Sequence, residues 1–226
     1  MCGRFTISVN QEDLKEHLYK QFGIEDYDID FFLPRYNIAP GENIIAVISD
    51  GKNNRAGLLR WGFIPHFQKD EKASYKMINA KAETISKKPS FRDSFKNRRC
   101  IILADSYYEW QKVEDKKVPM RIMVKDKKIF SIAGIWSPFI RDDGSKIYTC
   151  AIITTAAGSD MISIHDRVPV ILNNDSEKVW LNPTIKDPLL LSELLNSLNE
   201  KLTYYQVSTI VNNPRNDSIE CIIEKN

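Results

Sequence analysis

The feature that most constrains this chain is a series of apolar, β-branched runs that are long enough for a strand and too short for anything larger. Each run has four to seven residues and is bounded by turn residues, which is typical of β-strands. The runs are Ile44–Ile48, Arg99–Leu103, Arg121–Val124, Ile129–Ile135, Tyr148–Thr154 and Val168–Leu172. Short polar turns at Asp126-Lys127 and Asp142–Ser145 join neighbouring runs, and such hairpin connections favour antiparallel pairing. The sequence therefore predicts a mostly antiparallel sheet.

Helical patterns lie on both sides of this strand-rich region. From Asn10 to Phe22, Leu14 and Leu18 continue a four-residue spacing, Asn10 can cap the first turn, and Gly23 can end the last one, so we predict a helix. We also predict helices at Ser176–Leu181 and from Pro188 to about Leu198, and strands at Thr203–Ser208 and Ile219–Ile223. No linker, repeat or low-complexity tract interrupts the chain. We therefore expect one α+β domain over residues 1–226.

Composition excludes several classes of protein. The 226 residues, 42% of them hydrophobic, can bury a sizeable core, which excludes disordered and fibrous chains. Because 32 Lys+Arg stand against 30 Asp+Glu, any contact with nucleic acid must come from a local patch. The four cysteines lie far apart and no signal peptide precedes them, so we expect neither a zinc site nor disulfides. No apolar run approaches the roughly 20 residues of a membrane span, so we expect no membrane association.

Cys2 stands directly behind the initiator methionine, where its chemistry is unusual. Its small side chain normally permits removal of Met1, which leaves a free α-amine beside a thiol. An α-amine has a pKa of about 7.7–8.0 against about 10.4 for lysine, so much more of it is neutral near pH 7. A neutral amine forms a Schiff base with an aldehyde, and the thiol can then close a thiazolidine ring on the imine carbon. The same residue can instead act as an N-terminal nucleophile in amide hydrolysis, and both interpretations stay open.

Three other side chains are candidates for proton transfer or for holding a reacting atom. His165 precedes an apolar run, and an imidazole titrates near neutral pH. Glu109 lies between Tyr108 and Trp110, and burial against these rings would raise its pKa. Asn79 offers an amide that can hold a reacting oxygen or nitrogen. Each also has a plain structural interpretation, as a packed histidine, a surface glutamate and a turn asparagine.

Basic and aromatic residues are interleaved along the chain, a mixture that suits single-stranded nucleic acid. Lysine and arginine neutralise phosphates, while flat rings stack on exposed bases. The same residues also fit an ordinary core and a solvated surface, and composition does not separate these interpretations. The residues are Arg4, Arg60, Trp61, Lys81, Phe91, Arg92, Arg98, Arg99, Trp110 and Arg167.

Six motifs, taken in order along the chain, resemble those of the SOS response-associated peptidase (SRAP) family. They are Met1–Phe5, Tyr36–Pro40, Arg60–Pro65, Asn79–Thr84, Tyr108–Trp110 and His165–Leu172. The resemblance implies an SRAP-like fold, in which a mostly antiparallel or mixed sheet curls toward a barrel with flanking helices. It also implies a function, namely sensing abasic sites in single-stranded DNA and forming a covalent DNA–protein crosslink that shields the lesion.

The resemblance also implies roles for single residues. Cys2 would form a thiazolidine with the ring-opened abasic sugar after Met1 removal, and Asn79 would position the amine and the lesion. Glu109 would shuttle protons, and His165 would protonate the sugar ring oxygen. The implied DNA contacts are Arg4, Pro40, Trp61, Lys81, Trp110 and Arg167, with Trp61 expected to wedge or stack at the lesion. No metal or cofactor is implied. We expect a monomer in the cytoplasm, associated with the nucleoid if the host is bacterial.

One departure from the family pattern concerns Lys81, since the family usually has arginine two residues after the motif asparagine. Lysine keeps the charge but loses the bidentate fork, so we expect a weaker or differently shaped phosphate contact.

Two other functions stay open beside crosslinking and a weak lyase-like turnover. One is a thiol autopeptidase that uses Cys2, Glu109 and His165, and the other is a non-covalent module for single-stranded DNA.

Overall fold

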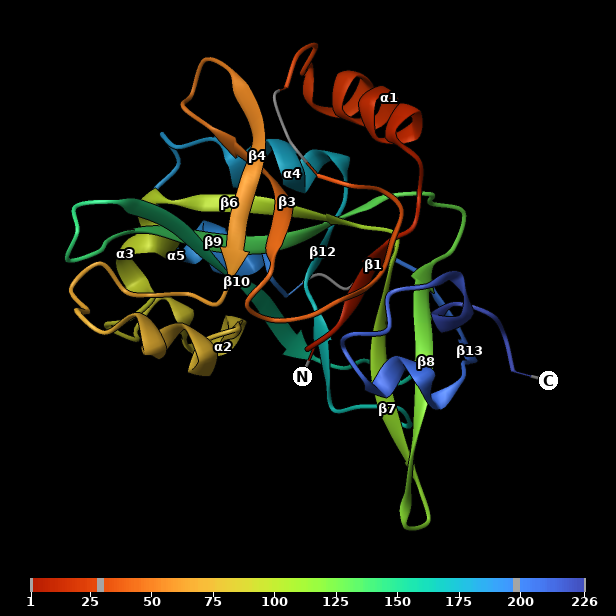
Figure 1. Ribbon diagram of the computed structural model, residues 1–226. Helices are drawn as coiled ribbons and strands as arrows, with labels where there is room; N and C mark the ends of the chain where they lie inside the picture. The colour runs from red at the N-terminus through yellow and green to blue at the C-terminus, as the bar shows by residue number, and fades with distance from the viewer. Residues whose placement is uncertain (1, 28–30, 197–199, 226) are drawn as a thin grey trace.

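A closed ring of five strands forms the centre of the molecule (Figure 1). The computed structural model describes residues 2–27, 31–196 and 200–225, except the side chains of residues 73–75. The ring strands are β3 (Asn43–Ser49), β4 (Asn54–Trp61), β6 (Arg99–Ala104), β9 (Phe130–Ile140) and β10 (Lys146–Ala156). They pair in the order β10-β4-β3-β6-β9, and β9 pairs with β10 to close the barrel. Every pair in the ring is antiparallel except β10 with β4.

A second, antiparallel sheet lies beside the barrel. Its order is β13-β8-β7-β1-β2. The strands are β1 (Phe5–Ile7), β2 (Arg35–Ile38), β7 (Ser106–Val113), β8 (Lys116–Val124) and β13 (Leu202–Gln206). A single residue, Asp105, separates β6 from β7, so the chain passes there from the barrel to the second sheet. The far ends of β7 and β8 form a two-stranded ribbon that projects beyond the body of the molecule (Figure 1).

Three short strands extend the barrel wall toward the second sheet. They are β5 (Asn79–Lys81), β11 (Arg167–Pro169) and β12 (Ile171–Leu172). β5 runs parallel to β10, and β11 pairs with β10 on its other side, so both strands meet the barrel at the same strand. β12 pairs with β9. These additions bring Asn79 and Arg167 to one end of β10.

Helices cover the outside of the barrel. They are α1 (Gln11–Phe22), α2 (Ala82–Ile85), α3 (Arg92–Asn97), α4 (Asn174–Leu181) and α5 (Pro188–Leu194), with 3-10 turns η1 (Glu71–Lys76), η2 (Thr209–Asn212) and η3 (Ile219–Cys221). Asn10 caps α1 by accepting the Asp13 N–H, and Gly23 ends it with a left-handed φ of 66°. Trp180 of α4 is fully buried and donates a hydrogen bond to the Cys100 carbonyl of β6. None of the helices in the described part of the chain is long and apolar enough to cross a membrane.

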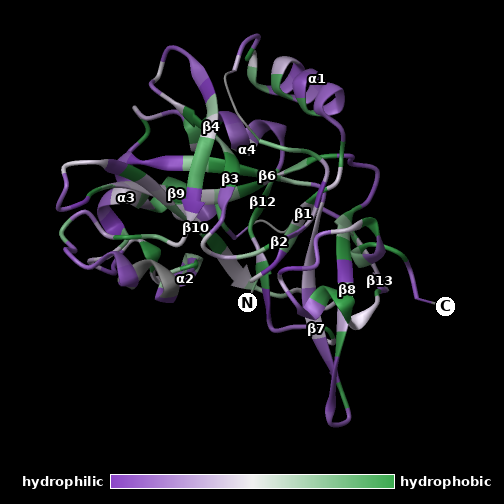
Figure 2. Ribbon diagram, viewed as in Figure 1, coloured by the Kyte–Doolittle hydropathy of each residue, from purple (hydrophilic) through white to green (hydrophobic). Residues whose placement is uncertain are grey.

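The main core fills the barrel and the space between it and the helices. Apolar residues dominate the barrel strands, while most of the loops are polar (Figure 2). A smaller apolar cluster lies under the C-terminal segment, where Tyr108, Val207, Val211 and Cys221 are fully buried. This second cluster holds the C-terminal segment against β7.

The α+β prediction and the mostly antiparallel barrel are confirmed, and so are the first helix and most of the predicted strands. Val168–Leu172 is divided into two strands because the chain changes partners at Val170, whose N–H bonds to β10 and whose carbonyl bonds to β9. The predicted strand at Ile219–Ile223 is wrong, since the segment forms a 3-10 turn. The helix expected to reach Leu198 ends at Leu194, and residues 197–199 lie outside the described part of the chain.

The hairpin predicted at Asp126-Lys127 is also wrong. The strands on its two sides, β8 and β9, belong to different sheets, so the turn is a crossing between sheets. The Asp142–Ser145 hairpin is confirmed, because it joins the antiparallel strands β9 and β10. Several strands were missed because their sequences are short or interrupted by charged and small residues; they are β1, β2, β4, β5 and β7.

Candidate active site

Cys2 lies just before β1, which is enclosed between β7 and β2. Its side chain is fully buried, and its carbonyl accepts a hydrogen bond of 2.8 Å from Asn79 Nδ2. Burial raises the pKa of the Cys2 thiol far above its ordinary value, and the charge of Glu109 raises it further. The thiol therefore stays protonated at neutral pH until a neighbouring base takes its proton.

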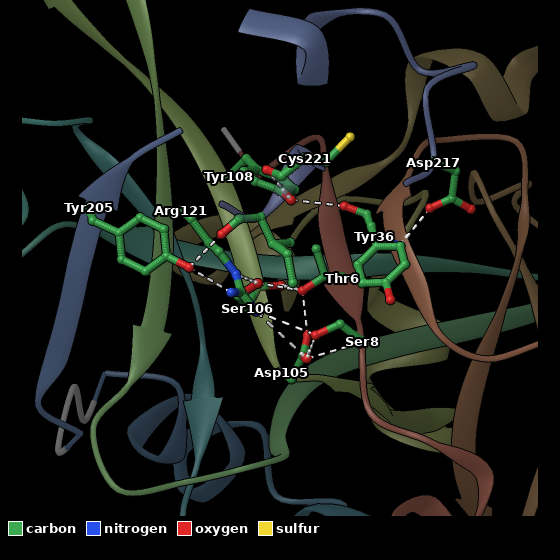
Figure 3. Close-up of polar contacts among 11 residues, drawn as sticks. Thr6, Ser8, Tyr36, Asp105, Ser106, Tyr108, Arg121, Tyr205, Asp217 and Cys221 are labelled. Carbon is green, nitrogen blue, oxygen red and sulfur yellow. Dashed lines mark hydrogen bonds and ion pairs between the residues drawn. The ribbon is translucent and has the colours of Figure 1, made fainter. Parts of the chain in front are cut away.

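A buried polar network fixes the position of β1 (Figure 3). Asp105, only 8% exposed, accepts hydrogen bonds from the Thr6 hydroxyl and from the N–H and hydroxyl of Ser8. Arg121 of β8 lies 3.8 Å from the Asp105 carboxylate and donates a 2.8 Å hydrogen bond to Ser106 Oγ. The network thus joins β1, β7 and β8 through side chains as well as backbone. It determines where the start of the chain lies relative to β7.

Glu109 is a buried carboxyl on β7, with 3% of its surface exposed. Burial raises its pKa from 4.5 to about 7, because the charged form loses its hydration. Its neighbours on β7, Tyr108 and Trp110, pack in the apolar cluster under the C-terminal segment. A carboxyl with this pKa can both donate and accept a proton near neutral pH.

His165 faces Glu109 from the loop that precedes β11. Its Nε2 lies 3.7 Å from Glu109 Oε2, and its Nδ1 accepts a 3.0 Å hydrogen bond from the Arg167 N–H. Burial lowers the pKa of His165, so the neutral ring dominates at pH 7 and carries its proton on Nε2, toward Glu109. When the ring is protonated, Nδ1 can instead donate to Asp166 Oδ1, 2.8 Å away. The two groups form a pair suited to passing a proton.

Asn79 completes the group from β5. Its Nδ2 donates a hydrogen bond to the Cys2 carbonyl, while its Oδ1 is buried and accepts no hydrogen bond from the residues that the structure describes. A buried acceptor without a donor is costly, so this oxygen is suited to a donor that arrives with a ligand or a freed amine. Within the described ranges no three His, Cys, Asp or Glu side chains gather as a metal site.

A hollow of about 450 Å³ opens onto Glu109 and His165, and its other lining residues are Trp110, Lys117 and Asn212. Trp110 Nε1 donates a 2.7 Å hydrogen bond to Asn212 Oδ1, which holds the indole against the C-terminal segment. Lys117 and Asn212 are not among the residues predicted from the sequence. Asn212 lies 102 positions from its partner Trp110, so no local pattern could indicate the bond between them.

Arg4 lies beside Trp110, one of the residues that line this hollow. Its Nη1 donates to Asn37 Oδ1 at 2.7 Å and to the Val211 carbonyl at 2.8 Å, and the guanidinium lies 5.8 Å from the Trp110 ring. Its Nε is buried and donates to no described residue. Burial lowers the pKa of Arg4, as expected for a cation partly removed from water. The side chain is therefore placed by the protein while part of its donor capacity stays unused.

Trp61 does not fit the role predicted for it. It is 0% exposed, its ring lies 5.3 Å from that of Phe5, and its Nε1 donates to the Ile78 carbonyl at 2.9 Å. A side chain without exposed surface has no face on which a base can stack. The prediction that Trp61 wedges or stacks at a lesion is therefore wrong for this structure, in which Trp61 supports β1 from the core.

The remaining predicted DNA contacts differ in how exposed they are and in whether they already bind other residues of the protein. Arg167 donates to both carboxylate oxygens of Glu83, at 2.6 and 3.0 Å, and also to the Thr154 carbonyl. The fork of Arg167 is thus already engaged, and its side chain is 11% exposed. Lys81 is exposed at the end of β5 and forms no ion pair with a described residue, while Pro40 is half-buried. Lys81 is therefore the freer cation on this side.

Comparisons with known proteins agree over almost the whole chain. A model of the family described as SOS response associated peptidase (SRAP) matches residues 1–214. The chain is 48% identical over 230 residues to the abasic site processing protein YoqW of Bacillus subtilis, covering 98% of this chain and 99% of that protein. It is 30% identical over 231 residues to the abasic site processing protein YedK of Escherichia coli, covering 98% and 99%. A crystal structure of a Bacteroides thetaiotaomicron protein matches with a TM-score of 0.84 at 25% identity, covering 99% and 100%.

Proposed function

The chain belongs to the SOS response-associated peptidase family, and we propose that it senses abasic sites in single-stranded DNA and crosslinks to them through Cys2. One observation carries the proposal: four separate segments bring together Asn79, which bonds to Cys2, and the facing pair Glu109 and His165, which lines an open hollow, with Glu109 close enough for its charge to act on the Cys2 thiol. Relatives named abasic site processing proteins support the same class of activity. Such a role places the protein wherever the DNA lies, which in a bacterium is the cytoplasm and nucleoid.

The crosslink forms in two steps after Met1 is removed. The freed α-amine of Cys2 adds to the aldehyde of the ring-opened abasic sugar, and loss of water gives an imine. Cys2 Sγ then bonds to the imine carbon while the thiol proton moves to the nitrogen, which closes a thiazolidine. The two steps release one water and need no oxidant, reductant or cofactor.

Glu109 and His165 supply the proton transfers. With a pKa of about 7, Glu109 can take a proton from the amine or thiol and return it to the departing hydroxyl. His165 acts in its protonated form: it donates the Nε2 proton to the sugar ring oxygen, which promotes opening to the aldehyde, and the neutral ring that remains holds its proton on Nδ1, beside Asp166. Burial lowers the pKa of His165, so the protonated ring gives up this proton readily, and the adjacent Glu109 carboxyl can then return a proton to Nε2. The pair therefore works as a short relay.

Asn79 and the wall of the hollow hold the reactants. The unused Oδ1 of Asn79 accepts a hydrogen bond from the freed amine, which orients its lone pair toward the aldehyde. Trp110, half-buried at the hollow, replaces Trp61 as the proposed stacking ring. We retain as phosphate or sugar contacts the other predicted residues, Arg4, Pro40, Lys81 and Arg167. Lys81 acts as a point charge without the geometry of an arginine fork.

The thiol autopeptidase is the weaker alternative. It needs the Cys2 thiolate as the first nucleophile, and burial together with Glu109 disfavours that thiolate. The crosslinking route begins instead at the nitrogen, and the thiol reacts only once the imine is in place. A non-covalent binding module would leave the Glu109–His165 pair without a use.

Variants of Cys2 test the proposal on abasic single-stranded DNA. Wild-type protein should give an adduct that survives a denaturing gel, and Cys2→Ala should give one only when borohydride reduces the imine. Cys150→Ala, which removes another buried thiol, is the matched control and should crosslink like wild type. A stable adduct of Cys2→Ala without borohydride would contradict the thiazolidine.

A further inference from the structure

The β7–β8 ribbon (Figure 1) carries a pair of lysines, one of which lines the active-site hollow. Lys112 of β7 and Lys117 of β8 are direct cross-strand partners. Because side chains alternate along a strand, Lys112 lies on the same ribbon face as Trp110. Lys117 also lines the hollow that contains Glu109 and His165. The hollow therefore continues onto a cationic face of the ribbon.

This pairing of like charges is unfavourable in the protein alone. Directly opposite residues have Cβ atoms about 4.5–5.5 Å apart, and like charges in these positions destabilise a ribbon. Both lysines are exposed, and neither forms an ion pair with a described residue. The turn residues Glu114 and Asp115 are acidic, yet they form no ion pair with the lysines either. An anion placed between the two ammonium groups would remove the repulsion.

We propose that Lys112 and Lys117 bind backbone phosphates of the DNA strand where it leaves the hollow along the ribbon. Lys112 lies three positions beyond Glu109 on β7, which corresponds to about 10 Å at 3.4 Å per residue. The lysines therefore reach nucleotides that flank the lesion, and the lesion itself stays at Glu109. This inference rests on the proposed function, because it takes single-stranded DNA as the ligand. None of the DNA contacts predicted from the sequence lies beyond Trp110 on the ribbon, so the proposal gives a function to its outer part.

The salt dependence of binding tests this proposal. Affinity for an undamaged single-stranded oligonucleotide is measured over a range of salt concentrations for wild type and for the double variant K112Q/K117Q. Each phosphate contact on a single strand contributes about 0.7 to the slope of log affinity against log salt, so the slope should become shallower by about 1.4. The matched control is K52Q/K178Q, which removes two exposed lysines beside a separate hollow near α4 and should keep the wild-type slope.

Two results would overturn the ribbon proposal. One is a wild-type slope in K112Q/K117Q, and the other is an equal loss in both double variants, which would indicate a general charge effect. Without DNA, K112Q/K117Q should melt no lower than wild type, and a lower melting temperature would contradict the repulsion. A separate assay tests the proposed function itself. If that function is wrong, wild-type protein forms no adduct with abasic DNA, and this result does not depend on the salt slope of the ribbon variant.

Discussion

Among single residues, Glu109 makes the sharpest prediction about pH. Its pKa is about 7 in the folded protein and 4.5 when solvated, so the folded state holds the proton more tightly. Stability from this group is therefore complete below about pH 4.5 and is lost as the pH rises through 7. Above pH 7 the loss corresponds to roughly 3 kcal/mol at most, given about 1.4 kcal/mol per tenfold change.

The substitution Glu109→Gln removes this titration. We expect the variant to melt several degrees above wild type at pH 8 and close to wild type at pH 4, as measured by thermal unfolding. The same variant should crosslink much more slowly, because a glutamine cannot pass a proton. An identical change in melting temperature at both pH values would show that the carboxyl is not held neutral by burial.

The proposed role of His165 in opening the sugar ring can be tested by comparing a ring-closed sugar with a free aldehyde. If it protonates the ring oxygen, His165→Ala should slow crosslinking of an abasic site, whose sugar is mostly ring-closed, by tenfold or more, on the scale of general acid catalysis. A substrate that presents a free aldehyde, such as a small aldehyde trapped with borohydride, should react at nearly the wild-type rate. Equal slowing on both substrates would remove the proposed role in ring opening.

Trp61 and Trp110 make a matched pair of tryptophans, one buried and one at the hollow. Trp110→Ala should weaken binding of single-stranded DNA by about 1–3 kcal/mol, the range for loss of one stacking contact. Trp61→Phe should bind DNA like wild type and lose only stability, because Trp61 has no exposed surface. Binding titrations and thermal melts of both variants check this. Weaker DNA binding by a stably folded Trp61→Phe protein would contradict the assignment to the core.

At the scale of elements, the position of β1 decides whether Cys2 meets Glu109. β1 has only three residues, so its backbone bonds alone fix its register weakly, and the Thr6–Asp105 contact adds a side-chain anchor. Thr6→Val leaves the buried Asp105 short of a donor, at a cost of about 1–3 kcal/mol. We expect Thr6→Val to lose stability in denaturant unfolding and to crosslink slowly, and Thr6→Ser to recover both. Full crosslinking by Thr6→Val would show that the anchor does not position the chain start.

Elements with strong local patterns were predictable, and elements defined by long-range contacts were not. The helix over 11–22 follows from its four-residue spacing and its caps, and four of the five barrel strands, β3, β6, β9 and β10, follow from their β-branched runs. The turn at Asp126-Lys127 looks like a hairpin locally, yet its flanking strands enter different sheets. The final apolar segment resembles a strand but contacts Tyr108 as a 3-10 turn, since packing against β7 overrides its propensity.

For the whole molecule, the motifs identified from the sequence converge in space. Successive members of the group Cys2, Asn79, Glu109 and His165 lie 30 to 77 positions apart in sequence, yet Asn79 bonds to Cys2 and His165 faces Glu109. The motifs were enough to identify these residues from the sequence. They did not indicate that Trp61 is buried or that Arg167 donates hydrogen bonds to Glu83. The hydrogen bond between Asn212 and Trp110 could not be predicted either, because the C-terminal segment carries no motif. Packing of this segment in the second core cluster places Asn212 beside the hollow. The assignment of the whole chain to one domain stays a prediction.

The most direct test of this account is mass spectrometry of the purified protein after incubation with an abasic single-stranded oligonucleotide. The account predicts that Met1 is absent, that the adduct mass equals protein plus oligonucleotide minus one water, and that the modified peptide begins at Cys2. A protein that keeps Met1 and still crosslinks, or an adduct located on a lysine, would contradict it.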